Sequence, residues 1–255
     1  MSASVWKTLS RCPAAELRPG HTMLNGQCFG WRPHESREGE FVGVLGRRVV
    51  AIRETSAATQ FRALHGGADG LEAELRDYFQ LGTVLAPLYA AWGGAGCERM
   101  GIIVGALDGL RILRQEPSEC LVSFICSSNN NVPRITLILD RMRERYGERL
   151  CPKAGLEGDT PAKPAAAATR AAALAAATAK PAAAAASPSP ARNKLMPRME
   201  VSADWHAFPA IEQLAAAPEA DLRELGLGYR AKVRFTKDPC CEFLNLSLRL
   251  VLIVQ

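Results

Sequence analysis

The segment SFICSSNNNVPR, residues 123–134, combines groups that can recognise a nucleotide. An asparagine amide carries donors and an acceptor in one planar group, which matches the edge of a base. The guanidinium of Arg134 is planar and can stack on a base or bind phosphate. Asn129 and Arg134 are separated by an expected turn, so both can reach one point. The alternative is that the asparagines only cap helix ends, where this residue type is favoured. The segment alone leaves both interpretations open.

Two other short segments raise the same question. In LGLGYR, residues 225–230, the glycines permit a close approach of the backbone, Tyr229 offers a ring for stacking, and Arg230 offers a guanidinium. The alternative is a helix end followed by an exposed aromatic residue. In GQCFGW, Gly26 could bring a main-chain carbonyl against a ligand, or it could simply end a strand. Two bends that each end in arginine favour nucleic acid more than either bend does alone.

Other kinds of site are not indicated. The chain has no GxGxxG after a strand and no GKS or GKT, so dinucleotide and P-loop sites are not predicted. None of the eight cysteines forms a CxxC pair, and no histidine lies at metal-ligand spacing from them. We therefore expect no metal, no cofactor and no disulfide framework, in a reducing compartment.

Composition and charge give weaker indications. The 255 residues carry a formal net charge of +5, which is compatible with a polyanionic partner without requiring one. The N-terminus has no signal-peptide-like apolar stretch, and the apolar C-terminal stretch FLNLSLRLVLIVQ is shorter than the roughly 20 residues that cross a bilayer. We expect a soluble protein with no membrane association.

The N-terminal part of the chain must position Gly26. Aromatic and β-branched runs at 26–32 and 41–55 predict antiparallel strands, with a turn at Gly46 and Arg47. From residue 69 the period becomes helical, and Asp69 is the expected N-cap of a helix over 69–81. Two further helices are expected, over 84–92 and 100–107.

The asparagines lie between two expected helices. The first spans 116–128, with Leu121, Phe124 and Ile125 on its buried face. The second spans 133–147 with its charges toward solvent, and Gly147 ends it. The asparagine run is therefore predicted to be a tight corner between helices.

The C-terminal half changes character twice. Residues 161–192 are mostly alanine with Pro, Lys and Arg, which predicts a disordered linker. It is interpreted either as filler or as a cationic tether for phosphate. Further helices are expected within 204–235. They are followed by an apolar tail of alternating leucines, whose period of two differs from that of the preceding helices.

Several motifs together resemble one family. GQCFGWR, RDYFQLGTVLAPLYAAWG, RQEPSECL, SFICSSNNN, RITLILDRMRERYG, FPAIEQLA and LRELGLGYRAK follow the order found in eukaryotic 8-oxoguanine DNA glycosylases. The resemblance covers about residues 5–150 and 200–233. It implies an α+β fold, in which an antiparallel, TATA-binding-protein-like sheet domain precedes an all-α glycosylase domain that is incomplete here.

The resemblance also implies roles for individual residues. Such enzymes flip an oxidised guanine out of a duplex in which it pairs with cytosine. Asn129, Arg134 and Arg230 would contact the orphaned cytosine, and Tyr229 would wedge into the stack. The carbonyl of Gly26 would accept a hydrogen bond from N7–H, which 8-oxoguanine has and guanine lacks.

The resemblance stops where the family's chemistry would begin. In the family, LGLGYRA is followed by a hairpin that carries a nucleophilic lysine, and then by an aspartate. Here Lys232 and Lys237 lack the hairpin glycines and an apolar helix around them. No catalytic residue is assigned, and we expect a C-terminally truncated member with little N-glycosylase or AP lyase activity of its own.

Alternatives remain open at this stage. The chain could be a non-catalytic damaged-DNA-binding or competing isoform, or a non-functional truncated product. The expected partner is double-stranded DNA with 8-oxoguanine opposite cytosine, bound by a monomer in the nucleus, with the mitochondrion as the alternative location. Five parts are predicted. They are a sheet domain with flanking helices (1–95), a first part of the helical glycosylase domain (96–152), a disordered insertion (153–200), further helices of that domain (201–235) and a divergent apolar tail (236–255).

Overall fold

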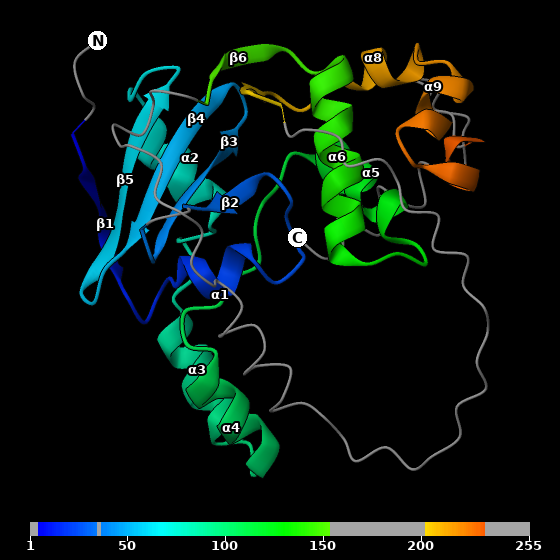
Figure 1. The fold of residues 1–255 in the computed structure, drawn as a ribbon. Coiled ribbons are helices and arrows are strands. Elements are labelled where there is room, and N and C mark those ends of the chain that lie inside the picture. The colour runs from blue at the N-terminus through cyan, green and yellow to red at the C-terminus, as the bar shows by residue number, and fades with distance from the viewer. Residues whose placement is uncertain (1–4, 35–36, 154–201, 233–255) are drawn as a thin grey trace, which may run out of the picture.

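The computed structural model describes residues 5–34, 37–153 and 202–232. An antiparallel sheet and a group of helices lie side by side, and a helical hairpin projects from the body (Figure 1). The α+β class is as predicted. The expected alanine-rich linker, Lys237 and the leucine-rich tail lie outside the described residues.

Four consecutive strands of the sheet form an antiparallel meander, and the first strand of the chain pairs with the last strand of that meander. The strand order is β1-β5-β4-β3-β2, and every neighbouring pair is antiparallel. The turn at Gly46 and Arg47 is confirmed, with Gly46 at φ 56°. The predicted strand at 26–32 is mostly wrong, because strand structure begins only at Trp31. The strands are β1 (Lys7–Pro13), β2 (Trp31–Pro33), β3 (Glu40–Leu45), β4 (Arg48–Glu54) and β5 (Ala58–His65).

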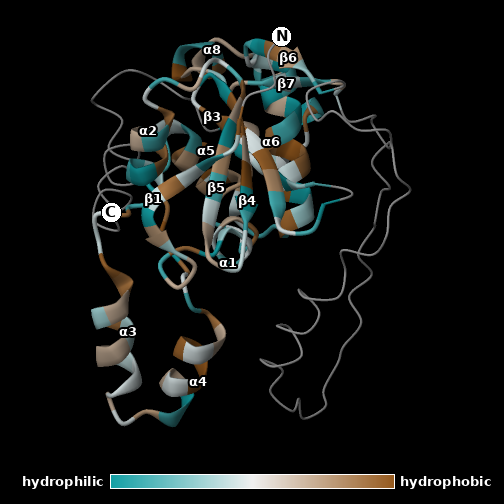
Figure 2. Ribbon diagram, turned by 90° about the vertical axis from the view of Figure 1, so that its left-hand side faces the viewer, coloured by the Kyte–Doolittle hydropathy of each residue, from teal (hydrophilic) through white to brown (hydrophobic). Residues whose placement is uncertain are grey.

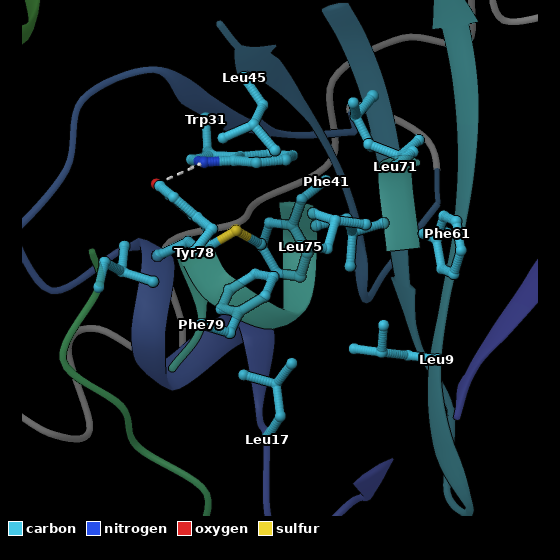
Figure 3. Close-up of a cluster of buried hydrophobic side chains, with 14 of the residues drawn as sticks. Leu9, Leu17, Trp31, Phe41, Leu45, Phe61, Leu71, Leu75, Tyr78 and Phe79 are labelled. Atoms are coloured by element: carbon cyan, nitrogen blue, oxygen red, sulfur yellow. Dashed lines mark hydrogen bonds between the residues drawn. The ribbon is translucent and has the colours of Figure 1, made fainter. Parts of the chain in front are cut away.

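One face of the sheet packs against α2 (Leu71–Tyr78) around large apolar side chains (Figure 3). The indole N–H of Trp31 donates to the Tyr78 hydroxyl at 3.0 Å, which satisfies both polar groups inside this core. The predicted N-cap at Asp69 is wrong, because Gly70 takes that position in a left-handed conformation with no side-chain cap. A short helix, α1 (Pro19–Met23), leads from β1 toward the segment that contains Gly26.

The projecting hairpin consists of α3 (Leu85–Gly93) and α4 (Glu98–Ala106), both predicted from sequence. Figure 2 shows it standing away from the sheet and the other helices. Only Leu85 is buried in these two helices, whereas Trp92 is 45% exposed and Ile102 66%.

The helical body has its own core. α5 (Pro117–Ser127) and α6 (Val132–Tyr146) pack against α8 (Ile211–Ala215), α9 (Glu219–Glu224) and the 3-10 helix η1 (Gly228–Lys232). Two expectations about buried faces are wrong. The first concerns α5, in which Phe124 was expected on the buried face. Phe124 is 65% exposed, whereas Cys126 is buried.

The second wrong expectation concerns charges on α6. Arg141 and Arg143 are buried rather than turned to solvent. Each guanidinium has carbonyl acceptors inside the protein: Arg141 donates to Leu225 O and Arg143 to Phe29 O, both at 3.4 Å. Such acceptors offset the cost of removing a charge from water.

A strand pair that the sequence did not suggest joins distant segments. β6 (Arg149–Pro152) pairs antiparallel with β7 (Asp204–His206). Beyond it, Lys153 N donates to Ala203 O at 2.8 Å. Lys153 and Ala203 therefore lie side by side, beyond the end of α6 that is remote from the asparagine corner (Figure 1).

Candidate nucleic-acid interface

The asparagine corner contains two capping residues. Asn130 Nδ2 donates to the carbonyl of Cys126 at 3.0 Å, which satisfies a backbone acceptor at the end of α5. Asn131 is the N-cap of α6, where its Oδ1 accepts from Arg134 N at 3.0 Å. For these two residues the capping interpretation is correct.

Asn129 is different. Its φ of 46° puts it in the left-handed region, which asparagine tolerates better than most residues. Asn129 and Arg134 are both exposed, and within the described ranges neither side chain makes a hydrogen bond or an ion pair. One amide and one guanidinium at this corner are therefore available to a ligand.

The second bend meets the first, although about a hundred residues separate them. The guanidinium of Arg230 donates to the carbonyl of Ser128, and its Nη2 lies 3.4 Å from Asn129 O. The Tyr229 hydroxyl lies 3.4 Å from the Ser128 hydroxyl, and its ring is 59% exposed. The two predicted bends thus meet at Ser128 and Asn129, and the exposed Tyr229 lies next to Ser128.

Arg230 itself is buried, at 7% exposure. Besides Ser128 and Asn129 it donates to Leu227 O at 3.3 Å, and its guanidinium carbon lies 4.5 Å from the centre of the Tyr229 ring. In this structure Arg230 fastens the bends together and supports the tyrosine. Its predicted contact with cytosine stays a prediction.

Gly26 lies next to the same corner. A Cβ built on Gly26 would lie 3.4 Å from Val132 Cγ2, at the first turn of α6. Its φ of 90° requires glycine, because L side chains rarely adopt that value. All three segments singled out from the sequence therefore converge on one region.

The segment that carries Gly26 is tied to the helical body by two arginines. Arg32 and Arg143 both donate to the carbonyl of Phe29, at 2.9 and 3.4 Å. Arg143 is also paired with Glu119 of α5, and Arg32 with Asp140 of α6. Sequence reasoning missed this connection, because it placed the charges of the helix over 133–147 toward solvent.

The two buried thiols near this region, Cys126 and Cys28, are unreactive because burial keeps them protonated. Burial raises the pKa of Cys126 to about 11 and that of Cys28 to about 12. Both are neutral at physiological pH, and a neutral thiol is neither a nucleophile nor a metal ligand. Lys232 is exposed at the end of η1. In the described part of the chain no group of three or more metal-ligating side chains is found.

Comparison with known proteins gives these geometries a context. Residues 10–121 match the family model described as 8-oxoguanine DNA glycosylase, N-terminal domain. The chain is 27% identical over 221 residues to the N-glycosylase/DNA lyase OGG1 of Arabidopsis thaliana. It is 30% identical over 228 residues to the N-glycosylase/DNA lyase of Saccharomyces cerevisiae.

The chain is similar to 8-oxoguanine DNA glycosylases, through the family model over residues 10–121 and through both relatives. The alignments cover 85% and 86% of it. They cover 46% of the plant relative and 48% of the yeast relative, so the chain spans about half the length of the curated relatives it matches. The family-model match includes Gly26 but ends before the asparagine corner, and the longer alignments with the two relatives account for most of the remainder.

Solved structures support the glycosylase fold. Clostridium acetobutylicum 8-oxoguanine glycosylase/lyase, in complex with dsDNA containing cytosine opposite 8-oxoG, superposes with a TM-score of 0.60 at 20% identity. That match covers 91% of this chain and 60% of the other. MBOgg1 in complex with a low-affinity DNA ligand gives a TM-score of 0.62 at 18% identity, covering 100% and 65%. Among the residues that our structure describes, no helix has the length and apolar character needed to cross a membrane.

Proposed function

We propose that this chain is a member of the 8-oxoguanine DNA glycosylase family and recognises 8-oxoguanine opposite cytosine in double-stranded DNA, with the lesion flipped out of the stack. The observation that carries the proposal is the convergence of three segments around one free amide and one free guanidinium. Asn129 and Arg134 are exposed and open to a ligand, and the exposed Tyr229 contacts Ser128, the residue before Asn129.

Asn129 and Arg134 would read the cytosine that loses its partner. Once the lesion leaves the helix, the Watson–Crick edge of cytosine presents a donor and acceptors, which an amide and a guanidinium can satisfy together. Tyr229 would fill the gap in the stack, because an aromatic ring replaces the lost stacking contacts. Arg230 would hold the two bends in register and add a donor to the same base.

The carbonyl of Gly26 would read the lesion itself. A main-chain acceptor gains a hydrogen bond from N7–H of 8-oxoguanine, whereas guanine presents a lone pair at N7. The wrong base leaves a buried acceptor unpaired, which is the costly case. The formal net charge of +5 would add affinity for the phosphate backbone that does not depend on sequence.

Base excision and strand cleavage are proposed for the whole protein on the names of its relatives. Lys232 is exposed at the end of η1 and lacks the apolar surroundings in which a nucleophilic lysine is activated. We therefore expect the 255-residue chain to bind damaged DNA without forming a covalent intermediate. We also propose that it acts as a monomer in the nucleus.

Binding titrations test the recognition part. Fluorescence anisotropy with duplexes that differ only in 8-oxoguanine or guanine opposite cytosine should show tighter binding to the lesion, and affinity for both should fall as salt rises. Equal affinities across the salt series would contradict the proposal.

Trapping with borohydride tests the catalytic part separately. A covalent adduct between this chain and the 8-oxoguanine duplex would show that it supplies its own amine. A lesion-selective complex with no adduct would instead favour a non-catalytic binding module, and the absence of binding would favour a non-functional product.

A further inference from the structure

The peptide unit between Gly26 and Gln27 is held by a neighbouring side chain. Gln27 N donates to Asn25 Oδ1 at 3.1 Å. In a trans peptide the N–H and the C=O point in opposite directions, so fixing one fixes the other. No cis peptide occurs among the described residues. The Asn25 side chain therefore sets the direction of the Gly26 carbonyl.

Gln27 is anchored through its whole amide group. Its Nε2 donates to Thr22 O at 2.8 Å and to Arg111 O at 2.9 Å. Its Oε1 accepts from Leu113 N at 3.0 Å. This side chain thus ties its own backbone to the end of α1 and to the segment that precedes α5. The peptide cannot turn by moving Gln27, because three hydrogen bonds would break.

The carbonyl of the next peptide unit, that of Gln27, already accepts a hydrogen bond. Gln115 Nε2 donates to the carbonyl of Gln27 at 2.6 Å. In contrast, no donor within the described ranges reaches the carbonyl of Gly26, which is only partly exposed and lies beside the first turn of α6. An acceptor that is held in direction and left open is prepared for a donor from outside the protein.

We propose that Asn25 and Gln27 are positioning residues that aim the Gly26 carbonyl and so set the preference for 8-oxoguanine over guanine. This inference rests on the proposed function. Hydrogen bonds weaken steeply as they bend, so a peptide that can rotate loses most of the discrimination between a donor and a lone pair at N7. Neither side chain needs to touch the lesion.

Asn25 offers a clean test because it is exposed, and its replacement removes one hydrogen bond without opening the core. The full chain is titrated with 8-oxoguanine:cytosine and guanine:cytosine duplexes, and the ratio of the two affinities is compared. Loss of one oriented hydrogen bond predicts that Asn25→Ala lowers this ratio by about 2- to 10-fold. Asn25→Asp keeps the acceptor and should restore the ratio, since its added charge affects both duplexes alike.

Two further measurements separate positioning from general damage. The preference for cytosine over adenine opposite an abasic-site analogue reports the asparagine corner and should not change in Asn25→Ala. Amide hydrogen exchange by NMR should show the Gln27 N–H exchanging at least roughly tenfold faster in Asn25→Ala than in the wild type. Gln27→Met, which keeps the length but removes the three hydrogen bonds, should lower the lesion ratio further.

The outcomes are distinguishable. A wild-type chain without lesion preference would overturn the proposed function, and this inference with it. A wild-type preference that persists unchanged in Asn25→Ala, or a Gln27 amide whose exchange does not change, would overturn the inference alone. A parallel loss of the lesion and cytosine preferences would show a merely structural role and would also overturn it.

Discussion

The pair α5 and α6 and the pair α3 and α4 are both two helices joined by a short turn, yet they distribute polarity in opposite ways. α5 and α6 bury apolar residues on the facing sides and expose an amide and a guanidinium at the turn. α3 and α4 bury little and expose apolar side chains such as Trp92 and Ile102.

The difference shows what a recognition site requires. The exposed groups Asn129 and Arg134 are attached to helices that are fixed by a shared core, so their positions are set before any ligand arrives. The α3–α4 hairpin has the more apolar surface but no comparable core beneath it. The hairpin is attached to the body at its first turn, where Leu85 N and Ala86 N donate to the two carboxylate oxygens of Glu16, at 2.8 and 3.1 Å.

The largest effect expected from this contrast is on stability. Ile138→Ala in α6 removes a side chain that is 1% exposed and should lower the free energy of unfolding by about 2–5 kcal/mol. Ile102→Ala in α4 removes one that is 66% exposed and should change it by less than about 0.5 kcal/mol. Chemical denaturation of both variants measures this. Similar losses would mean that α4 is packed as tightly as α6.

A second prediction concerns alkaline pH. The unfolded chain releases the Cys126 proton near pH 9.0, whereas the folded chain keeps it to about pH 11. Between these values the folded state binds more protons, so stability should fall as pH rises, by up to about 1.4 kcal/mol per pH unit for this thiol. Cys126→Ala should flatten this part of a denaturation series against pH. An unchanged slope would show that Cys126 is not buried in the folded state.

A third prediction separates the two kinds of asparagine. Asn131→Ala removes the N-cap of α6 and should lower the free energy of unfolding by about 1 kcal/mol. Asn129→Gly keeps the left-handed backbone free of strain and removes only an unbonded amide, so stability should change by less than about 0.5 kcal/mol. Thermal unfolding compares them, and equal losses would mean that Asn129 also has a structural role.

Much of this architecture could be predicted from the sequence. The antiparallel sheet with its turn at Gly46, the paired helices and the corner at the asparagines all follow from period and turn residues. The β6–β7 pair could not be predicted, because its strands are 4 and 3 residues long and some fifty residues apart. Phe124 was misplaced because α5 packs against α6 and η1 on the side of Val122 and Cys126.

The candidate residues could be named from the sequence, but their contacts could not. Residue type identified Asn129, Arg134, Tyr229 and Gly26 as candidates, and the structure brings their segments together. The burial of Arg230 depends on carbonyls of Ser128 and Leu227, which no side-chain pattern reveals. The hydrogen bond from Gln27 N to Asn25 is likewise a product of local geometry, since glutamine and asparagine in a loop predict no particular partner.

The most direct test of the account measures which base the corner prefers. The 255-residue chain is titrated with duplexes in which an abasic-site analogue lies opposite cytosine or adenine, together with Arg134→Gln and its charge-matched control Arg223→Gln, a surface residue paired with Glu219. We predict a preference for cytosine that Arg134→Gln lowers by about tenfold, in keeping with the worth of one good base contact, and that Arg223→Gln leaves unchanged. Equal binding to cytosine and adenine by the wild-type chain would contradict the claim that the converging bends read an orphaned cytosine.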